Sequence, residues 1–143
     1  EMSKEYSEFC TLPCKVLMNK APPIAQAKEN LVGLTNRLLD IDYKVVVVYE
    51  DGEPIGLVTL KDIMKWLVRS EDKEGILKDL ITVPLIMVSQ DSPLEDALNL
   101  MDKYDIKHIG VHEDKVLKGL VTQNSVKEMC ELYPHYLRQY IVT

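Results

Sequence analysis

The sequence predicts an α/β fold of the α+β kind, built as a tandem repeat of two β-α-β-β-α units packed with pseudo-two-fold symmetry. The first observation behind this prediction is the tetrapeptide GLVT, which occurs at residues 56–59 and again at residues 119–122, 63 residues further on. The second is that the same shift aligns other positions without a gap: Leu31 with Leu94, Asp42 with Asp105, Lys44 with Lys107 and Val48 with Val111. Self-similarity at a fixed shift indicates that one structural unit occurs twice.

Each repeat begins with a short apolar segment, at residues 23–25 and 85–88, which we expect to form a strand. A helix follows in each repeat. In the second repeat we expect Ser92 to be its N-cap, with Pro93 at the first helical position and Glu95 completing a capping box. Apolar residues then recur at helical spacing: Leu31, Leu34 and Leu38 in the first repeat, and Leu94, Ala97, Leu98 and Met101 in the second.

A β-hairpin and a second helix complete each repeat. The run VVVVY at residues 45–49, matched by HIGVH at residues 108–112, predicts a strand that is buried on both faces. The Asp-Gly pair within residues 50–54 favours a tight hairpin, whereas residues 113–117 lack the glycine and are expected to turn differently. The second helices are expected near residues 60–68 and 124–132. Trp66, in the first of them, is expected at an interface between the halves or between subunits.

We divide the chain into an N-terminal extension (1–14), a first unit (15–69), a linker (70–76), a second unit (77–132) and a C-terminal tail (133–143). The tail is rich in tyrosine and leucine, and we expect it to dock on the core or on a partner. Because the first residue is Glu1, we also expect that the chain can be a piece of a longer polypeptide.

Composition excludes several classes of function. The net charge of −6 disfavours nucleic acid as a partner. The odd count of cysteines, Cys10, Cys14 and Cys130, argues against a disulfide framework and for a reducing, cytoplasmic location, and no second Cys/His pair completes a metal site. No apolar run is long enough to span a membrane, and no secretory signal opens the chain. No catalytic arrangement of nucleophile and base is evident, so we expect no enzyme.

The pattern Thr59-x-x-Asp62 has two interpretations. It is a capping box, which stabilises a helix without any ligand. It is also suited to a nucleotide, because an ionised carboxylate offers two acceptor oxygens to the adjacent hydroxyls of a ribose. In that case Thr59 and the N–H groups of the helix start would donate hydrogen bonds to a phosphate, and Lys61 would add positive charge. Both roles can coexist.

A tandem β-α-β-β-α unit in which GLVT is followed by Asp62 resembles the CBS domain, named after cystathionine β-synthase, and two such units resemble a CBS pair, or Bateman module. The resemblance covers residues 16–129, although Val47-Val48 and Gly110-Val111 replace the Pro-Val common in the family's middle strand. It implies a binding module that requires no cofactor and holds an adenosine-containing ligand, such as AMP, ADP, ATP or S-adenosylmethionine, in two clefts. It also implies a homodimer that regulates a fused or separate effector protein by changing shape.

The resemblance and the repeat assign residues to the two sites. For the first site we expect Ile24, Ala25, Val45, Thr59, Lys61 and Asp62. For the second site we expect Met87, Val88, His108, Ile109, Thr122, Asn124 and Ser125. Because Ser125 replaces the aspartate, we expect the second site to be weaker, differently selective or empty. The alternative is a dimerisation module whose clefts are vestigial.

Overall fold

The computed structural model describes residues 4–71, 74–129 and 132, so the predicted C-terminal tail and Cys130 lie outside the described residues. The elements follow one another in the order α1 (Lys4–Cys10), η1 (Cys14–Val16), β1 (Ile24–Gln26), α2 (Leu31–Leu38), β2 (Val45–Glu50), β3 (Glu53–Thr59), α3 (Leu60–Arg69), η2 (Leu77–Leu80), β4 (Met87–Ser89), α4 (Leu94–Tyr104), β5 (His108–Glu113) and β6 (Val116–Thr122). Residues 123–129 form a further helix. No helix among the described residues is long and apolar enough to cross a membrane.

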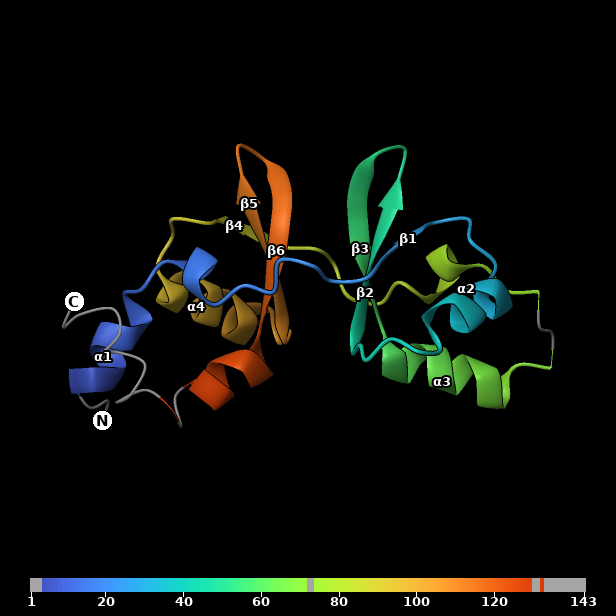
Figure 1. Ribbon diagram of the computed structural model, residues 1–143, viewed down its shortest axis with the longest axis horizontal. Coiled ribbons are helices and arrows are strands. Elements are labelled where there is room, and N and C mark those ends of the chain that lie inside the picture. The colour runs from blue at the N-terminus through green and yellow to red at the C-terminus, as the bar shows by residue number, and fades with distance from the viewer. Residues whose placement is uncertain (1–3, 72–73, 130–131, 133–143) are drawn as a thin grey trace. The chain divides into compact units, whose positions relative to one another are not determined.

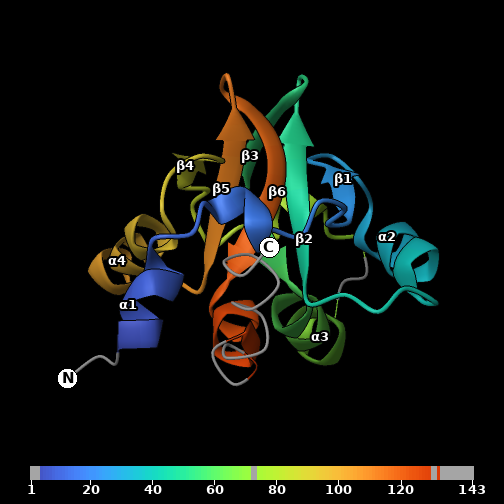
Figure 2. The same cartoon turned by 60° about the vertical axis from the view of Figure 1, so that its left-hand side comes forward.

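The chain forms two compact units, one of residues 21–85 and the other of residues 1–20 together with 86–143 (Figures 1 and 2). Each unit holds a three-stranded sheet, in the order β1-β2-β3 or β4-β5-β6. The first two strands of each sheet are parallel, and the last two form an antiparallel hairpin. Both hairpins have a register shift at the same place in the repeat, after Val48 and after Val111. The predicted fold class and the doubled β-α-β-β-α order are thereby confirmed.

Each unit is completed by a segment that the sequence places before the other repeat. In the unit of residues 1–20 and 86–143, the N–H of Cys14 donates to the carbonyl of Ser92 at 2.8 Å, and Asn19 forms a β-bridge with Leu120. In the unit of residues 21–85, the N–H of Leu77 donates to the carbonyl of Glu29 at 3.0 Å. Cys14 and Leu77 lie 63 residues apart, both begin a 3-10 helix, and both are fully buried. The repeat therefore extends upstream of each first strand.

The core of each unit lies between its sheet and its helices. In the unit of residues 21–85, Val46 and Val48 of β2 pack with the buried leucines of α2 and with Ile63 of α3. Val45 and Val47 alternate with them and are buried too, which confirms the prediction for the four-valine strand. In the other unit, Phe9 of α1 joins the core residues of β5, β6 and α4.

The glycine of each GLVT sequence lies where another segment of the same unit closely approaches the strand. A Cβ on Gly119 would lie 2.4 Å from the carbonyl oxygen of Asn19, which pairs with the neighbouring Leu120. A Cβ on Gly56 would lie 2.6 Å from Cγ2 of Ile81. Each copy of the tetrapeptide supplies the strand on which the segment that completes its unit lies.

Two local predictions were wrong. Helix α4 begins after Pro93, without a side-chain cap, instead of being capped by Ser92. The backbone of Ser92 is engaged elsewhere, because its carbonyl accepts the N–H of Cys14. The two hairpins also turn alike: φ is positive at Asp51 and Gly52, and likewise at Asp114 and Lys115.

Candidate functional site

The capping box predicted at residues 59–62 is present. Thr59 ends β3, and its Oγ1 accepts a hydrogen bond from the N–H of Asp62 at 3.1 Å. In return, Oδ2 of Asp62 accepts from Oγ1 of Thr59 at 2.8 Å and from its N–H at 3.4 Å. The next N–H, of Leu60, donates to the carbonyl of Lys44 just before β2. These bonds hold the start of α3 in place beside the hairpin.

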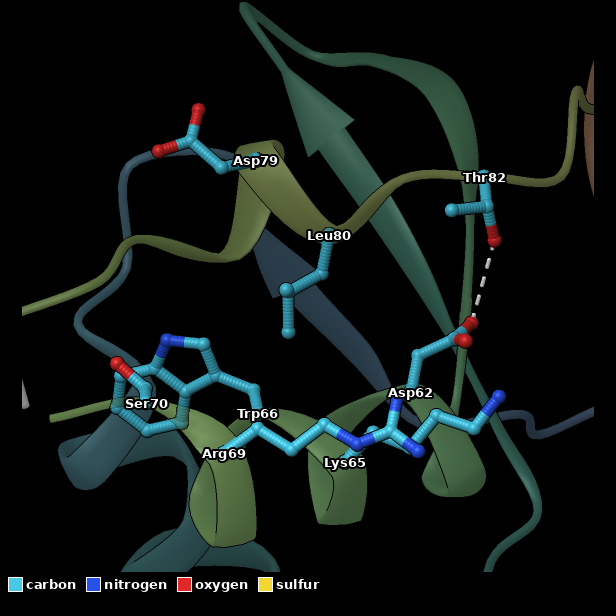
Figure 3. A pocket seen from close by; sticks show the side chains of 8 residues that line it. All are labelled: Asp62, Lys65, Trp66, Arg69, Ser70, Asp79, Leu80 and Thr82. Atoms are coloured by element: carbon cyan, nitrogen blue, oxygen red, sulfur yellow. Dashed lines mark hydrogen bonds between the residues drawn. The ribbon is translucent and has the colours of Figure 1, made fainter.

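A third group contacts the same carboxylate oxygen. Oγ1 of Thr82 donates to Oδ2 of Asp62 at 3.3 Å, and Thr82 lies in the segment that follows η2 (Figure 3). Within the described part of the chain, no hydrogen bond reaches the other oxygen, Oδ1. Asp62 is therefore oriented by one oxygen and presents the other as an acceptor.

An open pocket of about 360 Å³ adjoins Asp62. One wall is a face of α3, and the other is the end of η2 with the residues that follow it, so all lining residues belong to the unit of residues 21–85 (Figure 3). The lining residues are Asp62, Lys65, Trp66, Arg69, Ser70, Asp79, Leu80 and Thr82. This volume lies within the range of about 300–1,000 Å³ that is usual for small-molecule sites.

The pocket combines an aromatic ring with charges of both signs. Trp66 is half-buried, packs against the core of its own unit and lines the pocket, while its expected position at an interface stays a prediction. Lys65 and Arg69 are exposed, and among the described residues neither forms an ion pair, whereas the nearby Lys78 is paired with Glu50 at 2.8 Å. In Figure 3 the side chain of Arg69 extends along α3 toward the end of the pocket that holds Asp62.

The structure brings together only part of the first predicted site. Val45 pairs with Thr59 across β2 and β3, and Thr59 bonds to Asp62. Lys61 is exposed and does not line the pocket beside Asp62. Ile24 and Ala25 of β1 instead line a second open pocket, of about 450 Å³, together with Gln26, Lys28, Glu29 and Arg37. In that pocket the Arg37 guanidinium is held by Glu29 at 2.8 Å.

The second predicted site repeats the cap with different chemistry. The N–H of Ser125 donates to Oγ1 of Thr122 at 3.1 Å, and the N–H of Thr122 donates to Oγ of Ser125 at 3.2 Å. The hydroxyl of Ser125 also donates to the carbonyl of Thr122 at 2.8 Å, so its single proton is used within the cap. Asn124 is exposed beside it.

The remaining residues of that set lie on the sheet. His108 pairs with Thr122, and burial together with the neighbouring Lys107 lowers the pKa of the imidazole below 6.5. Ile109 has no exposed surface and belongs to the core. Met87 and Val88 of β4 pair with Gly110 and Val111, and Val88 also packs in the core.

The described residues hold no candidate metal site, and the thiol of Cys14 is not reactive. No group of three or more His, Cys, Asp or Glu side chains there is placed to hold a metal ion. Cys14 is fully buried, and burial together with the charge of Asp96 raises the pKa of its thiol to about 11. A thiol with such a pKa is protonated at neutral pH and unreactive.

Of the residues that line the pocket, sequence reasoning predicted only Asp62 as a ligand contact. The positions 62, 65, 66 and 69 have the spacing of one helix face, and this signal was available in the sequence. The opposite wall, at Asp79, Leu80 and Thr82, had no such signal, because a segment assigned to the second repeat packs in the unit of the first.

Comparison with known proteins gives consistent matches. A family model described as CBS domain matches residues 15–69 and again residues 77–130. An uncharacterized protein of Methanocaldococcus jannaschii is 33% identical over 94 residues, which are 56% of this chain and 22% of that protein. The chain therefore spans less than a quarter of the length of this relative.

Solved structures share the fold. The CBS domain pair of protein MJ0100, in complex with 5′-methylthioadenosine and S-adenosyl-L-methionine, superposes with a TM-score of 0.70 at 20% identity, over 85% of this chain and 97% of that one. The CBS domain of a bacterial CNNM/CorC family Mg²⁺ transporter, in complex with ATP, has a TM-score of 0.74 at 18% identity, over 87% of this chain and 90% of that one.

Proposed function

Because this chain belongs to the CBS domain family, with two copies in tandem, we propose that it is a regulatory module that binds an adenosine-containing ligand. Two structures with the same fold hold such compounds: one contains 5′-methylthioadenosine and S-adenosyl-L-methionine, and the other contains ATP. The module has no catalytic role in this proposal. It transmits ligand binding to a partner protein or to a further part of its own polypeptide.

The observation that supports the proposal most directly is the state of the Asp62 carboxylate. Its Oδ2 is held by Thr59 and Thr82, which orients the side chain beside the pocket, and its Oδ1 keeps its acceptor capacity. A ribose presents adjacent hydroxyl donors, and charged hydrogen bonds of this kind are roughly twice as strong as neutral ones. Asp62 therefore serves as the residue that binds the ribose.

The same reasoning makes the two repeats unequal. Ser125 fills the place of Asp62 in the second cap, but its hydroxyl proton is committed to the carbonyl of Thr122. It also carries no charge and has a single oxygen. We propose that the second repeat binds the ligand weakly or not at all.

A homodimer forms the second part of the proposal. Met64 and Val68 lie one turn apart on α3, and their exposed fractions are 56% and 84%. An exposed apolar pair on a helix favours contact with another protein surface. The same pair favours the alternative function, in which the chain only dimerises a larger protein and its ligand sites are vestigial.

Calorimetric titration of the full chain with AMP, ADP, ATP, 5′-methylthioadenosine and S-adenosylmethionine distinguishes the two functions. The informative variant is Asp62→Ser, because Ser125 shows that a serine at this position satisfies the same cap. We expect D62S to fold normally and to lose at least about tenfold in affinity, which is a free-energy change of about 1.4 kcal/mol. Ser125→Ala is the matched control and should bind as the wild type does.

Two results would contradict the proposal. If none of the five compounds binds, the dimerisation module is the better description. If S125A weakens binding more than D62S does, Asp62 is not the ribose residue.

A further inference from the structure

The pocket beside Asp62 contains two cationic side chains that the ribose contact does not explain. Lys65 and Arg69 follow Asp62 on the same face of α3, at intervals of three and four residues. Asp62 and Asp79 are also in the lining, yet no ion pair joins either of them to Lys65 or Arg69 within the described residues. The pocket thus offers positive charge that the described side chains leave unpaired.

Comparison of the two repeats shows that the cationic side chains Lys65 and Arg69 are not part of the shared fold. The positions 63 residues after Lys65, Trp66 and Arg69 carry Glu128, Met129 and Leu132. The two units share their strand order, their register shift and their cap, although this helix face changes from basic and aromatic to acidic and aliphatic. The basic and aromatic set accompanies Asp62 alone, which points to a ligand specific to the first repeat.

We propose that the ligand of the Asp62 pocket is a phosphorylated adenosine, whose phosphate is held by Lys65 and Arg69 and whose base lies against Trp66. This inference rests on the proposed function and names the chemical class of the ligand. A guanidinium binds phosphate through paired N–H groups, and a lysine adds a point charge. The flat face of an indole suits a purine ring.

The same charges select against other adenosine compounds. S-adenosylmethionine carries a sulfonium and an ammonium against a single carboxylate, so its net charge is positive and Lys65 and Arg69 disfavour it. 5′-Methylthioadenosine has no anionic group for them to bind. The ribose and the base are common to all these compounds. The phosphate is therefore the group that distinguishes the ligand of this pocket.

Trp66 is the only tryptophan of the chain, so its fluorescence reports on the pocket directly. The full chain is titrated with adenosine, AMP, ATP, 5′-methylthioadenosine and S-adenosylmethionine, with calorimetry as a second readout. We expect AMP to bind at least about tenfold more tightly than adenosine or 5′-methylthioadenosine, and the preference to shrink with added salt. The double variant K65Q/R69Q should lower the affinity for AMP to that for adenosine and leave the affinity for adenosine unchanged.

The matched control is K118Q/K127Q, which removes the same charge from two exposed positions outside the pocket and should bind AMP as the wild type does. If adenosine and AMP bind with equal affinity, or if K65Q/R69Q retains the full preference for AMP, this inference is overturned and the proposed function stands. Absence of binding by every adenosine compound overturns both.

Discussion

The hydroxyl of Thr82 donates to Oδ2 of Asp62, which joins the start of α3 to the segment that runs from one compact unit to the other. Thr82 lies three residues before Leu85, the last residue of its unit. A ligand that binds both oxygens of Asp62 competes with Thr82 for Oδ2. The segment that connects the units therefore contacts the proposed ligand residue directly.

The caps of the two second helices make similar contributions to stability. We expect Thr59→Ala and Thr122→Ala each to lower the free energy of unfolding by about 0.5–2 kcal/mol, because each removes the acceptor of the N3 amide. Chemical denaturation followed by circular dichroism measures the change. Thr59→Ser and Thr122→Ser keep the hydroxyl and serve as controls; a loss of stability in these variants equal to that in the alanine variants would show that the cap is not the cause.

Gly119 cannot accept a side chain without displacement of the segment that pairs with Leu120. A methyl group there meets the carbonyl oxygen of Asn19, and backbone gives way less readily than a flexible side chain. We expect Gly119→Ala to destabilise the protein by about 1–3 kcal/mol, as overpacking commonly does. Lys118→Ala, at the exposed neighbouring position, should change the melting temperature little; equal effects of the two substitutions would contradict the steric explanation.

His108 makes stability depend on pH. Burial and Lys107 lower its pKa in the folded protein, so the unfolded chain, with a pKa of about 6.5, binds the proton more readily. The free energy of unfolding should therefore fall as pH drops from above 6.5 toward the folded pKa, and His108 should add no further loss below it. His108→Gln should flatten this part of the profile in denaturation curves recorded across the range. His112→Gln, which removes another described histidine, should leave the His108 contribution in place; an unchanged slope in H108Q would exclude His108 as its source.

Cys14 should be inert in the folded protein. Its thiol is fully buried, and burial with the nearby Asp96 raises its pKa to about 11, so little thiolate exists at about pH 8. We expect iodoacetamide to leave Cys14 unmodified under native conditions and to alkylate it in denaturant, as measured by mass spectrometry of tryptic peptides. Rapid native labelling of Cys14 would show that the segment carrying η1 opens readily.

The boundaries of the compact units predict which fragment folds. Residues 21–85 include Leu77, which is buried in the core, and Val83, which bridges to Leu57. Residues 15–69 span the first family match but lack both. We expect the 21–85 fragment to unfold cooperatively and the 15–69 fragment to show no cooperative transition, by circular dichroism and by the dispersion of amide proton shifts. Comparable folding of both fragments would show that residues 70–85 are dispensable.

Much of the fold follows from local patterns in the sequence. The four-valine strand, the helix spacing of Leu31, Leu34 and Leu38 and the Thr59 cap depend on residues close to one another, and each is found as predicted. Ser92 was misassigned because its carbonyl accepts the amide of Cys14, 78 residues earlier. Lys115 adopts a positive φ without being glycine, since its hairpin has the same register as the first one.

The candidate site was predictable only in part, because some of its contacts join residues that are far apart in the sequence. Asp62 is marked by its position after GLVT, and the helix face that follows it has a regular spacing. Thr82 contacts Asp62 across a sequence separation of 20 residues. It lies in a segment that the sequence analysis assigned to the second unit. A sequence shift reveals which residues are equivalent, but it does not reveal which copy of a segment packs against which copy of a sheet.

In each unit the sheet of one repeat is completed by a segment that precedes the other repeat, and this has a consequence for a single repeat on its own. The segment of residues 13–20 completes the sheet of the second repeat, and its equivalent near Leu77 completes the sheet of the first. In one repeat taken alone, the segment that precedes the first strand therefore has no sheet to pack on, and the sheet lacks the segment that would complete it. Two separate copies of one repeat would complete each other's sheets by exchanging these segments. The connectivity of this protein is therefore that of a domain-swapped dimer whose two subunits have been joined into one chain.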